Sequence, residues 1–338
     1  MTPLRIGFLL PHYSKRSQSH HMQVALGLLA DAGVIVDVVN PAGRLVDLSE
    51  VRVEHDLNVL KRTGGLALSL AGALHARGAA IVNPYPVSLA LRDKIVAFRV
   101  LQSAGVPTPA TYVTSRAEEL APLLDAGPLI VKPYQGACGD GVRIIRTSTE
   151  LAGAQSGKDP VFAQRYHPPD GPDRKLYAIG DRIFATFKVF PARTEAEKHG
   201  EPFTPSPELR EIVRQCGRAF GIDLFGVDII ESEGRPYVVD MSTMPGFKGV
   251  PDAPRLLADY FRAAAERARR GAGEAGSAPS PARHPDDDPE ALRRLVAGSS
   301  ALELVLHALS RTPATPAQLA QVRQLLETMA DREGRAFR

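Results

Sequence analysis

Two aspartates of this chain are placed so that they could share a metal ion. They belong to two β-rich runs, residues 225–230 and 236–241, which are joined by a polar turn containing glycine. Asp228 and Asp240 lie symmetrically about that turn. An antiparallel hairpin would therefore place them opposite each other, and side-chain alternation would put Ser242 on the same face. Opposed carboxylates repel unless a cation lies between them, and hard oxygen ligands suit Mg²⁺. We therefore expect a magnesium ion between the two aspartates.

The residues near this hairpin indicate what the metal would act on. The segment PGFKG (245–249) follows the second run, breaks the strand and exposes backbone N–H groups. Upstream, Lys132 ends another β-rich run and precedes the Gly-rich turn GACGDG (136–141). Glycine lets the backbone approach a phosphate, and a lysine beside it neutralises charge. Hairpins also use such turns, and this one fits neither the P-loop nor the dinucleotide spacing. Together with the aspartates and Lys94, it indicates phosphoryl chemistry.

Composition bounds the class of protein. The chain has 338 residues, of which 44% are hydrophobic and 23% charged, so it is long enough for two or three folded domains. The net charge of +3 supports neither nucleic-acid nor membrane binding. Two distant cysteines lack metal-type spacing and indicate reduced thiols in a cytoplasmic protein. No apolar stretch approaches the ~20 residues of a membrane span.

The first part of the chain alternates strands with helices. We expect strands at 4–10, 34–39, 56–61 and 79–83, with helices at 22–32 and 65–77. This alternation predicts an open, mostly parallel sheet, whose ligands gather at the carboxyl ends of its strands. Lys15 and Lys61 follow two of these strands, so they could converge on a substrate. The alternative is that they are ordinary solvated charges.

Later elements are predicted from local signals. The pattern at 207–220 is the clearest: Ser206 can cap a helix, Pro207 suits its first position and Gly221 its end. Cys216 falls on the apolar stripe of that helix and is expected in the core. Further helices are expected at 89–104 and 256–270, strands at 128–132 and 142–146, and a hairpin at 176–179 and 182–189. The Gly-, Ser- and Pro-rich stretch at 271–289 predicts a flexible linker before a helical appendage at 290–338, which could pack on another subunit.

A series of motifs resembles the ATP-grasp superfamily. They are RDK (92–94), GVPTP (105–109), VKPYQGACGDGV (131–142), AQRYH (163–167), DRKLYAIGD (173–181), GVDII (226–230) and VVDMSTMPG (238–246). The resemblance spans roughly residues 4–265. It implies an α/β protein with an N-terminal parallel-sheet lobe (1–86), a central lobe (87–166) and a C-terminal lobe with the metal site (167–270). ATP and Mg²⁺ are the cofactors it implies.

The resemblance also implies roles for individual residues. Those for the cofactor are Lys94, Lys132, Gly139 and Gly141 at the phosphates, Gln164, Arg165 and Tyr166 at adenine, and Asp228, Asp240 and Ser242 at the metal. Those for the reaction are Lys175, Lys188 and Gly246 as catalytic residues, and Lys15, Lys61 and Lys248 at the substrate.

Two branches of the superfamily compete. The first hypothesis is a kinase similar to the inositol-polyphosphate 5/6-kinases, acting on a small polyol or phosphorylated cyclitol. DLNVLKRT (56–63), Lys175, Asp240 and PGFKG favour it. The second is a RimK-like carboxylate–amine ligase that acts through an acyl phosphate, favoured by the Gly-rich turn and by residues 92–109. Ligases usually have Arg at Lys175 and Glu at Asp240.

Other positions depart from both branches. Both usually have Asn at Ser242, and the kinases have a His near Ala137 and Cys138. These departures motivate a third hypothesis, a nucleotide-binding regulatory protein without turnover.

Overall fold

The structure, a computed structural model, describes residues 2–10, 20–41, 45–61, 64–136, 141–154, 159–189, 194, 197 and 199–275. The chain divides between Ala282 and Arg283, and every described residue belongs to the first unit. The predicted appendage, most of the predicted linker, Lys15 and Gly139 lie outside the described residues.

The N-terminal sheet is parallel, as the alternating pattern predicted. Its strands lie in the order β2-β1-β3-β4. Their bounds are β1 Arg5–Leu9, β2 Ile35–Val39, β3 Leu57–Leu60 and β4 Ile81–Val82. The helices α1 (His20–Asp31) and α2 (Gly65–Ala76) and the 3₁₀ helix η1 (Leu48–Glu50) connect them. All of β3 is buried, as expected for a strand covered on both faces.

The central sheet is antiparallel and smaller. Its order is β5-β8-β6-β7, with β5 Thr111–Thr114, β8 Val161–Arg165, β6 Leu129–Pro133 and β7 Arg143–Ile145. Leu129, Val131 and Ala163 pack with Leu120 of the 3₁₀ helix η2 (Ala117–Ala126) and with Leu151 of α5 (Ser148–Leu151). The pattern did not predict β5 or η2.

The predicted single helix at 89–104 is wrong. The chain forms α3 (Tyr85–Arg92) and α4 (Lys94–Ser103), which are separated by Asp93. Asp93 is extended, with φ −96° and ψ 107°, and its carboxylate accepts from the N–H groups of Ile95 and Val96. An aspartate at such a break satisfies the unpaired donors of the new helix. The break makes Lys94 the first residue of α4, and its N–H donates to Tyr134 O at 2.9 Å.

The C-terminal sheet is antiparallel and carries the aspartates. Its order is β11-β10-β9-β12-β13. The bounds are β11 Glu201–Phe203, β10 Arg182–Lys188, β9 Asp173–Ile179, β12 Leu224–Ser232 and β13 Arg235–Ser242. The two predicted hairpins, β9–β10 and β12–β13, are confirmed. The small strand β11 was not predicted.

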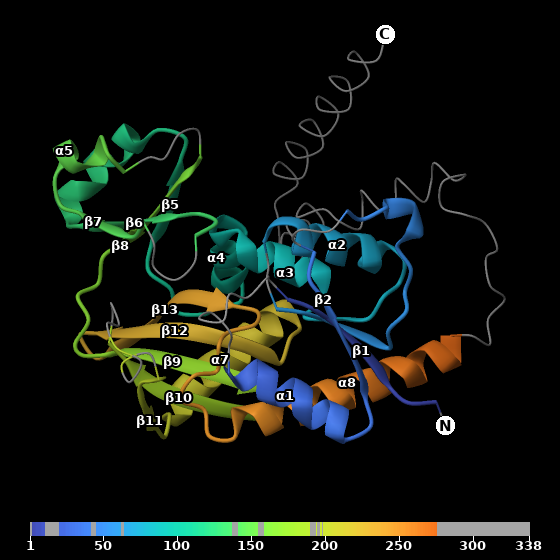
Figure 1. Cartoon of the computed structure of the whole chain (residues 1–338). Coiled ribbons are helices and arrows are strands. Elements are labelled where there is room, and N and C mark those ends of the chain that lie inside the picture. The colour runs from blue at the N-terminus through green and yellow to red at the C-terminus, as the bar shows by residue number, and fades with distance from the viewer. Residues whose placement is uncertain are drawn as a thin grey trace, which may run out of the picture. The chain divides into compact units, whose positions relative to one another are not determined.

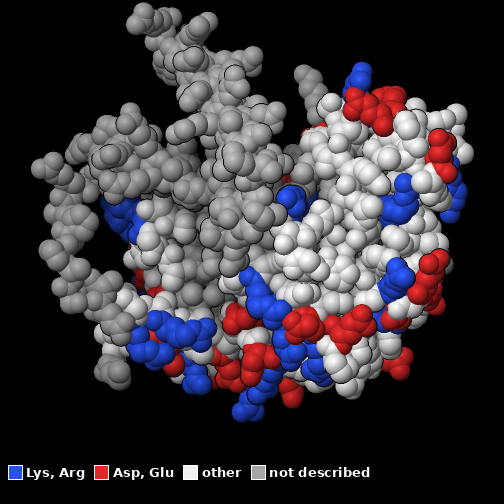
Figure 2. Space-filling model, turned by 180° about the vertical axis from the view of Figure 1, so that it is seen from behind, with Lys and Arg blue, Asp and Glu red and all other residues white. Residues whose placement is uncertain are grey.

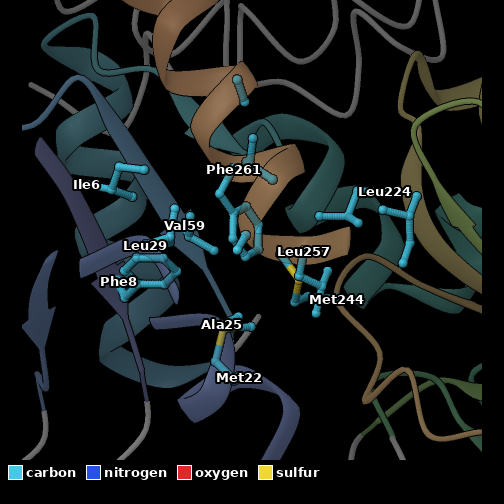
Figure 3. Packing of buried hydrophobic residues seen from close by; sticks show 14 of the residues in the cluster. Ile6, Phe8, Met22, Ala25, Leu29, Val59, Leu224, Met244, Leu257 and Phe261 are labelled. Carbon is cyan, nitrogen blue, oxygen red and sulfur yellow. The ribbon is translucent and has the colours of Figure 1, made fainter. Parts of the chain in front are cut away.

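One apolar core joins the N-terminal sheet to the C-terminal lobe. The helix α8 (Ala253–Ala275) is longer than the predicted 256–270 and lies beside α1 (Figure 1). Its Phe261 is fully buried and meets Phe8 of β1 edge-on, with ring centroids 5.6 Å apart. Leu224 and Met244 of the C-terminal lobe complete the same cluster (Figure 3).

The helix α7 (Pro207–Phe220) begins and ends where its local signals predicted. Ser206 Oγ accepts from the N–H of Leu209 at 3.2 Å, and Gly221 is left-handed with φ 64°. Cys216 lies in the core, where burial raises the pKa of its thiol to about 12. The local signals sufficed here because capping and helical periodicity act within a few residues.

We expect Ser206→Ala to destabilise the protein by about 1 kcal/mol, because the N–H of Leu209 loses its acceptor. Urea denaturation measures the loss. Ser69→Ala is the matched control, since Ser69 is exposed in the middle of α2 and its loss should change stability by less than about 0.5 kcal/mol. Equal effects in the two variants would show that the cap contributes nothing.

The surface of the described residues mixes the two signs of charge. Basic and acidic side chains lie next to each other along the lower part of the face seen in Figure 2. On α7, for example, Glu211 pairs with Arg218 at 2.6 Å. None of the helices in the described part of the chain is long and apolar enough to cross a membrane.

Candidate active site

A bulge in the β12–β13 hairpin brings Asp228 opposite Asp240. The turn residues Glu233 and Gly234 both have positive φ, 51° and 69°, as in the tight hairpin turns that suit twisted strands. From this turn the ladder pairs Ile229 with Val238, so a regular continuation would set Asp228 against Val239. The register shifts between Asp228 and Ile229, and Asp228 pairs with Asp240 instead. The predicted opposition is confirmed, through a bulge that the pattern did not reveal.

Lysines from two other elements neutralise this carboxylate pair. Lys175, opposite Asp228 on β9, places its Nζ 2.6 Å from Asp228 Oδ1. Lys94, at the start of α4, places its Nζ 2.8 Å from Asp240 Oδ1. The sequence led us to expect a cation between the aspartates, and the ammonium groups supply positive charge on either side of them. Each ion pair is made by the Oδ1 atom of its aspartate and leaves the Oδ2 atom outside the ion pair.

The oxygens of the hairpin fit Mg²⁺. Ser242 lies opposite Gly226 on the face of the two aspartates, and its buried Oγ has no hydrogen-bond partner. An unsatisfied buried hydroxyl beside two carboxylates is an oxygen donor set of the kind Mg²⁺ takes. In the described part of the chain no group of three His, Cys, Asp or Glu side chains could hold a metal by itself. Mg²⁺ is usually held by one or two carboxylates together with substrate phosphates.

Lys132 ties the central sheet to the bulge. Its Nζ donates to Gln164 Oε1 and to Val239 O, each at 2.9 Å. Burial lowers the pKa of Lys132 to about 8, and the nearby Asp240 partly offsets that effect. Gln164 is fully buried and donates through Nε2 to Thr111 Oγ1. Lys94 and Lys132 thus both reach the β12–β13 hairpin, and their contact with phosphate stays a prediction.

Arg165 and Tyr166, predicted to meet adenine, are largely engaged within the central lobe. Their backbone N–H groups donate to Ala110 O and Pro128 O. The Arg165 guanidinium binds the carbonyls of Leu123, Gly127 and Pro128. These two N–H groups therefore cannot also bond an adenine edge, and Gln164 faces Lys132 instead. Contact with adenine remains a prediction for the side chains and carbonyls of this segment.

Lys188 and Lys248 lie near Lys175. Burial lowers the pKa of Lys188 to about 8, and the positive charges of Lys175 and Lys248 lower it further. Lys188 Nζ donates to His199 O and, at 3.3 Å, to Lys248 O. Tyr177 donates to the same carbonyl of Lys248 at 3.2 Å. The structure therefore brings together Lys175, Lys188 and Lys248 at the PGFKG segment, and their catalytic and substrate roles stay predictions.

The PGFKG segment needs its second glycine. Gly249 has φ 83°, and a Cβ there would lie 2.3 Å from His199 O. At Gly246, the residue predicted to be catalytic, a Cβ would meet only the side chain of Lys248, at 3.7 Å, so packing does not require glycine there. The carbonyl of Gly246 lies 3.3 Å from Nδ1 of His21 on α1.

Backbone atoms constrain two other residues of the predicted site, Gly141 and Lys61. Gly141 has φ 75°, and a Cβ there would press on Pro133, so the end of the Gly-rich turn requires glycine. Lys61, predicted to bind substrate, directs its Nζ to the carbonyls of Met244 and Pro245, at 2.9 and 2.7 Å.

Asp173 is a candidate that the pattern missed. It lies two residues before Lys175 on β9, and therefore on the same face. Burial raises the pKa of Asp173, Asp228 raises it further, and Lys132 lowers it. Strand alternation applied to residues 173–179 would have found it. Asn83 was missed as well, because its partners lie more than a hundred residues away along the chain.

A parallel N-terminal sheet, two antiparallel sheets, and lysines of the central sheet facing carboxylates of the last hairpin define an ATP-grasp protein. The chain belongs to this superfamily, and residues 91–255 match the model of the RimK-like ATP-grasp domain. It is an ATP-dependent enzyme. The hypothesis of a regulatory protein without turnover is therefore set aside.

Curated relatives and solved structures agree with this assignment. The "Ribosomal protein bS6--L-glutamate ligase" of Escherichia coli O1:K1 / APEC is 26% identical over 231 residues, which cover 63% of this chain and 77% of the relative. The RimK domain ATP-grasp protein of Sphaerobacter thermophilus DSM 20745 superposes with a TM-score of 0.61 at 19% identity, covering 76% of this chain and 98% of that one. The ATP-grasp ligase PsnB, complexed with a minimal precursor, Mg and ADP, gives 0.59 at 18% identity, covering 78% and 99%.

Proposed function

We propose that the protein is a Mg²⁺-dependent carboxylate–amine ligase. The observation that carries the proposal is the match of residues 91–255 to the RimK-like domain. The curated relative reported above is a ligase by name, and this favours the second hypothesis over the kinase. The segment that contains Lys61 was one observation that favoured the kinase. It now supports the kinase less, because the Lys61 ammonium donates to two backbone carbonyls.

In this proposal ATP supplies the phosphoryl group and Mg²⁺ concentrates positive charge on its oxygens. Lys94 and Lys132 neutralise the phosphate charge from the central lobe, while Asp228, Asp240 and Ser242 hold the metal. A substrate carboxylate oxygen bonds to the γ-phosphorus as the bond to ADP breaks. An amine then bonds to the acyl carbon, loses a proton, and releases inorganic phosphate, leaving an amide.

Positive charge beside the hairpin suits the anionic partners of this reaction. Lys175 takes the position where ligases usually have arginine, and Lys188 and Lys248 lie near it. A lysine offers a point charge instead of a two-pronged donor, so we expect it to neutralise a carboxylate or phosphoryl oxygen without fixing its orientation. We propose that the acceptor is a small molecule that carries a carboxylate, and that the enzyme joins this carboxylate to a separate amine.

Isotope transfer tests the proposal. Purified protein is given MgATP with a pool of amino acids and short peptides whose carboxylates carry ¹⁸O, and a pool of polyols in a separate reaction. The acyl-phosphate route moves one carboxylate oxygen into inorganic phosphate, so we expect an amide product together with ¹⁸O-labelled phosphate by mass spectrometry. Lys132→Met, which removes a phosphate-neutralising lysine, should abolish both.

Two results would contradict the proposal. A phosphorylated polyol would restore the kinase hypothesis. Amide without ¹⁸O in the phosphate would exclude the acyl phosphate and leave a different route of activation.

A further inference from the structure

Side chains of the N-terminal sheet hold three consecutive carbonyls of the C-terminal lobe. Lys61 Nζ donates to Met244 O at 2.9 Å and to Pro245 O at 2.7 Å. Asn83 Nδ2 donates to Thr243 O at 2.7 Å and to Leu224 O at 2.6 Å. Lys61 follows β3 and Asn83 follows β4, and these strands are parallel neighbours. We call Lys61 and Asn83 the carbonyl clamp.

The clamp is an unfavourable way to join two lobes. Burial lowers the pKa of Lys61 to about 8, and among the described residues no carboxylate pairs with it. A buried ammonium without a counter-charge disfavours the folded state, whereas apolar contact would not. Apolar contact is already present, because Met244 and Phe247 belong to the shared core. Adhesion between the lobes therefore does not explain the clamp.

The clamped segment leads from the candidate metal site into the PGFKG turn. The clamped segment starts directly after Ser242. At the far end of the PGFKG turn, the hydroxyl of Tyr177 donates to the carbonyl of Lys248. Between these points Phe247 has an unusual φ of 51°. Within the described residues, the N–H groups of Gly246 and Phe247 donate to no protein acceptor. Carbonyls tied to one side and unpaired N–H donors form a backbone arrangement that suits an anion.

We propose that Lys61 and Asn83 are positioning residues: they fix the carbonyls of Thr243, Met244 and Pro245 so that the amides of Gly246 and Phe247 are oriented toward the oxygens of the activated carboxylate. This assignment replaces the substrate-binding role that the sequence predicted for Lys61. Its catalytic consequence rests on the proposed ligase function, whereas the clamp itself is a property of the fold.

Kinetics of matched variants test the clamp. Lys61→Met removes both donations, and a misplacement of the turn should lower kcat for amide formation by about 100-fold. Since nucleotide binding is made elsewhere, KM for MgATP should change by less than about twofold. Lys61→Arg keeps the charge and several donors and should recover most of kcat. Arg269→Met is the control, because Arg269 of α8 also binds two consecutive carbonyls, those of Thr2 and Pro3.

Hydrogen exchange tests the clamp independently of the reaction. The amides of Val250 and Ala253 donate to Phe247 O and Val250 O, so they report on the order of the turn. We expect them to exchange faster in Lys61→Met and at the native rate in Arg269→Met. Native exchange in Lys61→Met overturns the clamp, even if the protein proves not to be a ligase.

The kinetic outcomes separate the alternatives. An unchanged kcat in Lys61→Met, with or without a raised KM for the acceptor, overturns the positioning role. If Lys61→Met does not fold, Lys61→Gln keeps one donor, and its kcat should be clearly lower than that of the wild type. A wild-type kcat in that variant likewise overturns the role.

Discussion

Asp240→Asn should lower the MgATP-dependent rate by about 100- to 1,000-fold, the effect of losing one charged contact to the metal and phosphate. Asparagine keeps an oxygen that can accept from Lys94 and from the N–H of Met241, as Asp240 Oδ1 does now. The substitution therefore removes a negative charge with little change in shape. Calorimetry gives a second measure: the affinity for ATP should rise with Mg²⁺ in the wild type and much less in the variant.

Asp181→Asn is the matched control for this experiment. Asp181 is exposed in the β9–β10 turn of the same sheet, outside the hairpin, so the variant should keep the native rate and Mg²⁺ dependence. Full activity in Asp240→Asn would remove the metal assignment. Equal losses in both variants would indicate a general effect of charge on the sheet.

Phe261→Ala should destabilise the protein by about 3–5 kcal/mol. Its ring is fully buried and meets Phe8 of β1 edge-on, and Leu224 and Leu257 belong to the same buried cluster (Figure 3). Truncation removes the burial of a large apolar side chain and leaves a cavity that the packed neighbours fill only in part. The melting temperature should fall by roughly 10 °C for a protein of this size, as differential scanning calorimetry would show.

Leu66→Ala provides the comparison for Phe261→Ala. Leu66 is exposed on α2, and its truncation should cost less than about 0.5 kcal/mol. A loss below about 1 kcal/mol for Phe261→Ala would show that the site collapses around the missing ring. The two sheets would then be held together by other contacts.

Features with local causes were predicted well from the sequence. The helix at 207–220 has its cap, apolar stripe and final glycine within one segment, and α7 has the predicted bounds. The alternation of strands and helices before residue 84 predicted the parallel sheet. The motif order predicted the superfamily, which the match over residues 91–255 supports.

Features that depend on distant partners were predicted poorly. The single helix at 89–104 was wrong because helical periodicity continues across Asp93, although that carboxylate caps a new helix. The preference for a kinase rested partly on Lys61, whose side chain reaches a segment more than 180 positions away. Nothing near Lys61 in the chain indicates those acceptors.

The sequence by itself determined that the two carboxylates lie on the two strands of one hairpin, because turn chemistry and strand alternation act between neighbouring residues. The tertiary structure decided what surrounds that pair. It supplied Lys94 and Lys175 as counter-charges, the Val239 bulge that accepts from Lys132, and the carbonyl clamp. These contacts join lobes whose residues are far apart in the chain, and burial and charge select them only once the sheets have packed together.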